Sequence, residues 1–188
     1  AAGEAAEAMV EEWKENGVDP SGKKVVAISA DSGSAVNQAR CEGFLDKIQE
    51  LVPDIKVIET QYCDNDISKT QDTVDNLILA NDDLIGIFGD NNHMGDGIAN
   101  SIDQNGKAGA IVAYAFDSDD TEIEAIKNGI LTGIVVQNPY GMGHDGVLAV
   151  IAALEGKEVE HDVTAATTLV TADNIETDEV QSLLYPGK

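Results

Sequence analysis

The stretch IFGDNNHMGDG, residues 87–97, contains side chains of the kinds that bind metal ions or transfer protons. Asp90, His93 and Asp96 follow an apolar run at intervals of three, which can place them on one face of a helix. No other histidine falls beside a neighbouring apolar run, and a metal site needs further ligands and groups that orient them. We therefore predict no metal site. Asp90 and Asn92 are expected to cap the helix that follows, with His93 in its solvated first turn.

The stretch GMGHDG, residues 141–146, matches the pattern G-x-G-x-x-G that approaches the phosphates of dinucleotides. That fingerprint belongs to the first strand–helix turn of its fold, and an acid follows it by about twenty residues. Here the pattern comes after the fifth apolar run, with Pro139 between them. We predict helix packing at small residues, no cofactor, and a protein that is not an enzyme. Paired carboxylates for acid–base chemistry stay open, but nothing in the sequence selects one pair.

Short apolar runs rich in β-branched residues alternate with segments of helical periodicity. The runs cover residues 24–30, 55–62, 84–89, 110–116 and 131–137. Each run is apolar throughout, as in strands buried on both faces. Helices are expected at residues 2–15, 34–50, 68–80, 92–104, 119–127 and 140–154. Strict alternation with short links predicts an α/β fold, a parallel sheet with helices on both faces.

Residue types at the helix ends agree with these bounds. The predicted N-caps are Ser34, Ser68 and Asp119, and the predicted helix stops are Gly17, Gly106, Gly129 and Gly156. After Gly156, residues 161–174 predict one more strand or extended crossing segment, and residues 177–184 a short helix. Cys41 falls within a helix and Cys63 at a strand end, so two buried free thiols are expected rather than a disulfide.

The composition is that of a packed and strongly acidic chain. Its 188 residues, 43% of them hydrophobic, suit one substantial domain. The net charge of −24 repels phosphate backbones and anionic membrane surfaces, so no nucleic-acid partner is expected and a neutral or cationic ligand fits best. No stretch has the length of a membrane span, and the first residues do not have the pattern of a signal peptide.

Polar residues follow all of the predicted strands, at the edge of the sheet where α/β proteins bind ligands. They are Asp31 and Ser32, Asp64 and Asn65, Asp90 and Asn91, Asp117 and Ser118, and Gln137 and Asn138. Polar strand ends are also common because loops face solvent. Arg40 favours a binding site, since it shares a helical stripe with Phe44 and leans toward this edge. It is expected to pair with an acid there, to donate to a ligand, or both.

Four stretches together resemble a known family. SGSAVNQARCEGF, IFGDNNHMGDGIANSI, AYAFDSDDTEIEAIKNG and LTGIVVQNPYGMG are similar to segments of the type I periplasmic sugar-binding proteins, the ribose- and galactose-binding family. The same module forms the effector domain of LacI-type repressors. The resemblance implies a periplasmic-binding-protein-like fold in which a hinge joins two lobes and a sugar is enclosed between them.

The resemblance also implies roles for particular residues. Arg40 matches the Arg of an R-x-x-G-F motif that donates to sugar hydroxyls, and Asn91 matches the amide after the third strand. Asp117 matches the acid of the F-D motif, and Gln137 the polar residue that ends the strand nearest the hinge. Ser32 and Asp64, at the ends of the first two strands, complete the set of expected ligand contacts.

The resemblance covers the C-terminal lobe and the segments that close the other lobe, whose N-terminal part is missing. It implies a sugar-binding lobe at 1–138, segments completing the missing lobe at 139–174, and a C-terminal tail or helix at 175–188. The implied function is the solute-binding component of an ABC transporter, with a sugar and a membrane permease as partners.

The implied location is periplasmic or extracellular, with a lipid anchor if the source is a Gram-positive bacterium. Self-association, or a separate chain supplying the missing lobe, is a further expectation. The alternative function is the ligand-sensing domain of a LacI-type regulator, and a nucleotide-binding enzyme ranks third.

Overall fold

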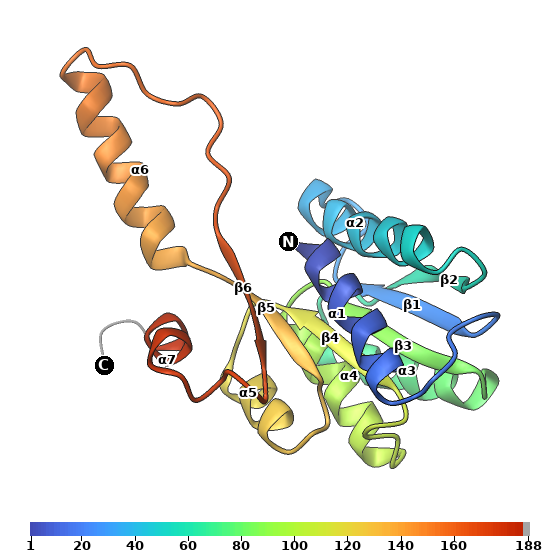
Figure 1. Ribbon diagram of the computed structural model, residues 1–188. Coiled ribbons are helices and arrows are strands. Elements are labelled where there is room, and N and C mark those ends of the chain that lie inside the picture. Colours follow the sequence, from blue (N-terminus) through green and yellow to red (C-terminus); the bar gives the residue numbers. More distant parts are fainter. Residues whose placement is uncertain (186–188) are drawn as a thin grey trace.

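A six-stranded sheet forms the centre of the computed structural model, which describes residues 1–185 (Figure 1). Its strands are β1 (Lys24–Ser29), β2 (Lys56–Tyr62), β3 (Leu84–Gly89), β4 (Val112–Phe116), β5 (Gly133–Gln137) and β6 (Thr167–Thr171). They lie in the order β2-β1-β3-β4-β5-β6. The first five are parallel, and β6 runs antiparallel to β5. The predicted α/β class is confirmed, but the sheet is mixed, because the chain leaves it after β5 and returns along the same edge.

Helices cover both faces of this sheet. The helices of residues 1–185 are α1 (Ala2–Glu15), α2 (Ala35–Leu51), α3 (Ile67–Ala80), α4 (Asn92–Gln104), α5 (Asp120–Lys127), α6 (Pro139–Leu154) and α7 (Asp178–Leu184). Buried side chains of α1 and α2 pack on one face, and those of α3, α4, α5 and α7 pack on the other. Successive strand residues point to opposite faces, so Val25 packs on the side of α1 and α2 and Val26 packs on the other side. This is why the strands are apolar without alternation.

The α1–α2 face contains the large aromatic side chains of the core. The rings of Phe44 and Phe88 stack with their centroids 4.5 Å apart. Trp13 is also buried, and its indole Nε1 donates to the backbone oxygen of Ile85 at 3.2 Å. The buried polar tip is therefore satisfied, as stable cores require.

Three local predictions are wrong. β2 is an edge strand in which no residue is buried, because it pairs only with β1 and its sequence KVIETQY contains polar residues. The N-cap of α3 is Asp66 rather than Ser68, since its carboxylate accepts from the backbone N–H of Lys69 at 2.8 Å. The N-cap of α4 is Asn91 rather than Asp90 or Asn92. The caps at Ser34 and Asp119 are confirmed.

Most other local predictions hold. The four glycine stops all adopt positive φ, at Gly17, Gly106, Gly129 and Gly156. Cys41 and Cys63 are buried free thiols. The glycines of the 141–146 motif lie inside α6 and do not form a strand-to-helix loop. The helix packing predicted at these small residues is not found among the described residues, since nothing lies within 4 Å of a Cβ placed on Gly143 or Gly146. Within the described part of the chain, no helix is long and apolar enough to cross a membrane.

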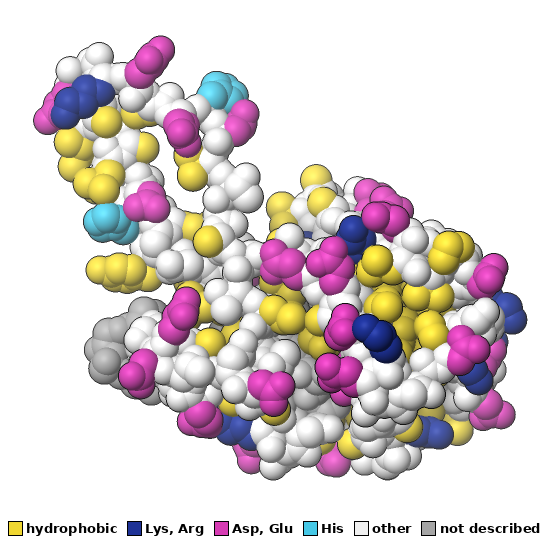
Figure 2. Space-filling model, viewed as in Figure 1, with side chains coloured by type: hydrophobic (Ala, Val, Ile, Leu, Met, Phe, Trp, Pro, Cys, Tyr) yellow, Lys and Arg dark blue, Asp and Glu magenta, His cyan; other side chains and the backbone are white. Residues whose placement is uncertain are grey.

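Helix α6 projects from the body as an arm, together with the extended segment 155–166 (Figure 1). None of its residues is buried, although it contains the exposed apolar side chains of Val147, Leu148, Val150, Ile151 and Leu154. Apolar atoms are visible along this arm in Figure 2. By contrast, β6 belongs to the sheet, and Ile175 and Val180 are buried in its core. Part of the expected tail, residues 186–188, lies outside the described residues.

Candidate functional site

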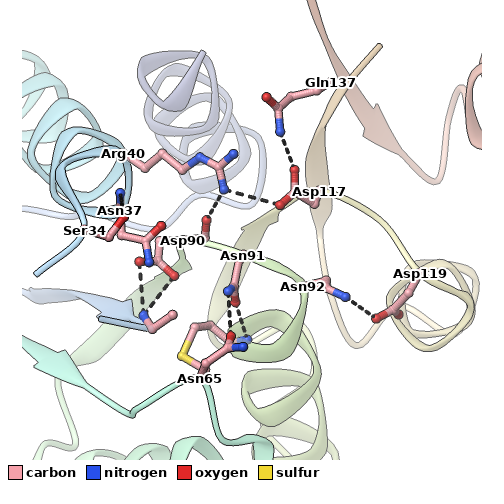
Figure 3. A network of polar contacts seen from close by, with 12 residues as sticks. Ser34, Asn37, Arg40, Asn65, Asp90, Asn91, Asn92, Asp117, Asp119 and Gln137 are labelled. Carbon is pink, nitrogen blue, oxygen red and sulfur yellow. Dashed lines mark hydrogen bonds and ion pairs between the residues drawn. The ribbon is translucent and has the colours of Figure 1, made fainter. Parts of the chain in front are cut away.

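Arg40 lies at the edge of the sheet formed by the carboxyl ends of the parallel strands (Figure 3). It comes from α2, which starts at the Ser34 cap directly after the β1 loop. Its Nη1 donates to the backbone oxygen of Asp90 at 2.7 Å and to Oδ2 of Asp117 at 3.3 Å. The guanidinium carbon sits 3.7 Å from the centroid of the Phe116 ring. These contacts fix a cation whose side chain remains 15% exposed.

Asp117 follows β4 and is held from two sides. Its Oδ2 accepts from Arg40, and its Oδ1 accepts from Nε2 of Gln137 at 2.5 Å. Its backbone has φ 74°, and its N–H donates to the oxygen of Val135 at 2.9 Å. A non-glycine residue in the left-handed region is strained, and such strain is concentrated at functional sites. The carboxylate remains 35% exposed, so it can accept from further donors.

Asp90 is a buried tie between β3 and β1 rather than the predicted helix cap. Its side chain is 0% exposed and accepts from Ser29 Oγ at 2.6 Å and from the Ala30 N–H at 3.0 Å. Burial raises the pKa of Asp90, while the bonds from Ser29 and Ala30 and the charge of Arg40 oppose the rise. Because its own carbonyl receives Arg40, Asp90 aligns the acceptor that positions the guanidinium.

Asn91 and Asn65 form a second polar pair on the same edge (Figure 3). Nδ2 of Asn91 donates to Oδ1 of Asn65 at 2.8 Å, while Oδ1 of Asn91 accepts from the N–H of Met94 at 3.0 Å and caps α4. Asn65 and Asp64 both adopt positive φ after β2. His93 Nδ1 lies 3.2 Å from the oxygen of Asn65. The amide of Asn91 is therefore fixed next to the residue whose carbonyl holds Arg40.

The other two predicted site residues lie outside these contacts. Asp64 pairs with Lys69 at 2.6 Å, and its side chain is 79% exposed. Ser32 is exposed, and its backbone oxygen accepts from the Gln38 side chain. Among the hydrogen bonds of residues 1–185, none joins Ser32 or Asp64 to Arg40, Asp117 or Gln137. The structure thus brings three of the six predicted residues into direct contact.

The shape of the surface also marks this edge. An open hollow is lined by Arg40, Phe116, Gln137 and Thr167, together with the start of α1 and the start of α2. Asp117 and Gln137 line a second hollow beside α6 and α7. Gln137 therefore stands between two concave surfaces, at the point where the chain leaves the sheet for the arm.

Sequence reasoning missed two contributors to this site. Phe116 was assigned only to a strand, although it supplies the ring on which Arg40 stacks. The tie made by Asp90 was missed because an Asp between a strand and a helix is also typical of a helix N-cap. A usable signal was Ser29, the hydroxyl that ends an otherwise apolar strand beside β3. No group of three or more His, Cys, Asp and Glu side chains within residues 1–185 could hold a metal ion.

Charged and amide groups are fixed at the carboxyl ends of the strands of this α/β sheet. This arrangement is typical of α/β proteins that bind small molecules. The model of the periplasmic binding protein domain matches residues 1–158. The chain belongs to this family of periplasmic binding proteins, as the sequence resemblance implied.

Related proteins agree with this assignment. The chain is 28% identical over 137 residues to the ribose import binding protein RbsB of Haemophilus influenzae, covering 73% of this chain and 46% of that protein. It is 28% identical over 150 residues to the D-allose-binding periplasmic protein of Escherichia coli, covering 79% and 48%. The chain therefore spans about half the length of these curated relatives.

A solved structure matches nearly the whole chain. A carbohydrate transporter solute-binding protein from Agrobacterium radiobacter, in complex with D-arabinose, superposes with a TM-score of 0.88 at 30% identity. The match covers 98% of this chain and 62% of that one. A match of this extent includes residues of the α6 arm.

Proposed function

We propose that this chain is the sugar-binding lobe of a solute-binding protein that delivers a monosaccharide or similar polyol to an ABC transporter. The observation that carries the proposal is the Asp117 carboxylate, which Arg40 and Gln137 hold at an open rim. Membership of the periplasmic binding protein family supports it. So do the relatives named for ribose and D-allose, and the solute-binding protein whose structure was solved in complex with D-arabinose.

The chemistry of the rim suits an uncharged polyol. A carboxylate accepts from two neighbouring hydroxyl groups, while a guanidinium and amides donate to the same oxygens. Arg40, Asp117, Gln137 and Asn91 would form the centre of the ligand contacts. Ser32 and Asp64 would act at its margin, after a rearrangement that frees Asp64 from Lys69. The net charge of −24 disfavours anionic ligands at the same surface.

The arm supports a two-lobe arrangement. Residues 1–138 would form one lobe, and α6 with segment 155–166 would pack within the other, which closes over the sugar by a hinge motion. Because β6 pairs with β5, we propose that residues 167–174 belong to the first lobe. The segment that completes the other lobe would then be residues 139–166, which is shorter than the range 139–174 expected from sequence. Residues 175–185 pack on the core of the first lobe.

The transporter role gives further proposals. The partner would be a membrane permease, and the protein would act in the periplasm or outside the cell, with a lipid anchor if the bacterium is Gram-positive. Where the other lobe is not present, the apolar side of α6 would associate with a second copy. Sedimentation of the 188-residue chain tests this, and a monomer at high concentration would contradict it.

The decisive experiment measures sugar binding by the chain alone and by a two-lobe form. A micromolar site is worth about 8 kcal/mol, so half its contacts leave about 4 kcal/mol, or a millimolar constant. For the chain alone we expect an NMR titration to give a millimolar dissociation constant for D-ribose, D-allose or D-arabinose. The chemical-shift changes should be centred on Arg40 and Asp117.

Two outcomes would count against this proposal. Shifts produced by NAD rather than by any sugar would favour the nucleotide-binding alternative. Micromolar calorimetric affinity of the single lobe would contradict the two-lobe arrangement. The variant Asp117→Asn should lose sugar-dependent shifts, whereas Asp103→Asn, an exposed acid on α4, should retain them.

A further inference from the structure

Two acidic side chains are buried between α4 and α5, and the proposed sugar contacts do not use them. Asp96 is 6% exposed and Glu122 is 0% exposed. Within the described residues, Oδ1 of Asp96 and both carboxyl oxygens of Glu122 have no hydrogen-bond partner. Ionised carboxylates are rarely buried unpaired, because the loss of hydration is strongly unfavourable. These two groups therefore need a physical explanation.

A third acid, Asp119, connects them to the ligand-binding edge. Its Oδ1 accepts from the Glu122 N–H at 3.0 Å, which caps α5, and its Oδ2 accepts from Nδ2 of Asn92 at 3.0 Å (Figure 3). Besides burial, the negative charge of Asp119 also acts on Asp96 and raises the pKa of its carboxyl group. Two ionised carboxylates contain no donor, so a hydrogen bond between these two groups would require a proton. We call Asp96, Asp119 and Glu122 the acid cluster.

Glu122 points from α5 into this cluster. Its Oε1 lies where a Cβ on Gly95 would be, so Gly95 leaves the space that the carboxyl group fills. Gly95 directly precedes Asp96 on α4. The cluster is therefore a close contact between two helices, built around a residue without a side chain.

The charges facing the cluster are mostly negative. Burial raises the pKa of Asp96 to about 6, Asp119 adds to the rise, and His93 on α4 opposes it. Burial is also the main cause that raises the pKa of Glu122 well above its ordinary value, followed by Asp119, Asp96 and Asp117. The charged groups that act most strongly on Glu122 are all acids, so burial and charge both favour the neutral form of its carboxyl group.

We propose that the acid cluster is a proton-binding site that joins α4 to the cap of α5 and so holds the loop of Asp117 in place. The protonated carboxyl group of Asp96 would keep its proton and donate a hydrogen bond to Asp119, two residues after Asp117, while neutral Glu122 fills the space over Gly95. Loss of these protons places like charges at the cap and pushes the helices apart. A proton fits better than a metal ion, since no group of three such side chains in residues 1–185 could coordinate one.

The sign of the pH effect follows from linkage. The pKa of Asp96 is about 6 in the folded protein, above its ordinary value of 3.8. The stability that comes from protonated Asp96 is therefore fully present below pH 3.8 and is lost as the pH rises to about 6. One proton changes the folding equilibrium about tenfold per pH unit across that window, or about 100-fold in all for Asp96. Glu122 extends the loss of stability to higher pH. Because the cluster would hold the loop of Asp117, sugar binding should also weaken at higher pH. This consequence rests on the proposed function.

The test is a titration of the whole chain with matched variants. Asp96→Asn retains a donor to Asp119, and Glu122→Gln retains the shape without the charge. Asp103→Asn and Glu124→Gln make the same changes at exposed positions of the same helices. We expect the melting temperature of the natural chain to fall by several degrees between pH 4.5 and 8. Both cluster variants should flatten this fall, and both controls should retain it.

Carboxyl NMR shifts of the natural chain keep the proposal testable if a variant does not fold. We expect Asp96 to titrate near pH 6 and Glu122 above its ordinary range, and titration of both below pH 4.5 would overturn the proposal. So would a stabilisation by Ca²⁺ or Mg²⁺ that the cluster variants abolish. A pH-dependent melting temperature without any sugar-induced shift would support the proton site and contradict only the proposed function.

Discussion

The sheet body and the α6 arm contain similar apolar sequences in opposite surroundings. In the body, side chains such as Phe44, Phe88 and Ile98 are 0% exposed. In the arm, Leu154 is 84% exposed and no residue of α6 is buried. Figure 2 shows acidic side chains scattered over both regions, with apolar side chains along one side of the arm. Hydrophobic sequence alone therefore does not tell whether a segment is in its final environment.

This difference also concerns why each helix exists. The helices of the body are stabilised by packing an apolar face on the sheet, which supplies most helical stability in proteins. α6 has a good cap at Asn138 and a proline in its first turn, so its local signals are complete. What it lacks is a surface to cover it, which is the physical basis for assigning it to a second lobe.

The largest expected effect is the loss of stability when a large apolar side chain of the body is replaced by alanine, compared with the same kind of change in the arm. Phe44→Ala should lower the free energy of unfolding by about 3–5 kcal/mol, because it removes a stacked ring from a packed interior. Ile151→Ala on the arm should change it by less than about 0.5 kcal/mol, because that side chain packs on nothing in the body. Urea unfolding measures both. A loss above about 2 kcal/mol for Ile151→Ala would show that the arm is covered in solution, and repeating the measurement at several concentrations would identify self-association.

The predictability of the fold follows the same division. Continuous apolar runs gave β1, β3, β4 and β5, because strands covered on both faces show a strong signal. β2 was assigned to the wrong environment, since its position at the edge depends on which strand pairs with which. The direction of β6 likewise depends on the path of the arm, and no local pattern encodes that path.

The site was predictable in part for a similar reason. Helical periodicity and side-chain direction placed Arg40 on the rim with an acid, and it pairs with Asp117. The role of Asp90 was misread because a local rule, helix capping, competed with a contact to another strand. Glu122 and Asp96 were not foreseen, since acids on helices usually face solvent and their burial depends on how α4 meets α5.

A second prediction compares a polar tie in the body with one in the arm. Asp90→Ala should cost about 2–3 kcal/mol of unfolding free energy, because it leaves the buried Ser29 hydroxyl and Ala30 N–H without their acceptor. Glu155→Ala removes an exposed pair with Lys157 at 2.6 Å and should cost less than about 0.5 kcal/mol. Chemical denaturation again gives both values. Equal losses would mean that the buried tie at Asp90 contributes no more to stability than the exposed pair in the arm.

The smallest expected effect concerns the helix caps, where the local chemistry of the two regions is alike. Asp66 caps α3 on the body, and Asn138 caps α6 by accepting from the Gly141 N–H at 2.8 Å. Asp66→Ala should lower global stability by about 1 kcal/mol, the usual value of a cap. Asn138→Ala should leave global unfolding unchanged and instead speed amide exchange in the first turns of α6, because the arm opens without the body. Hydrogen exchange followed residue by residue distinguishes the two. If Asn138→Ala also lowered the urea midpoint, the arm and the body would unfold as one cooperative unit. The body would then stabilise α6 even though no residue of α6 is buried.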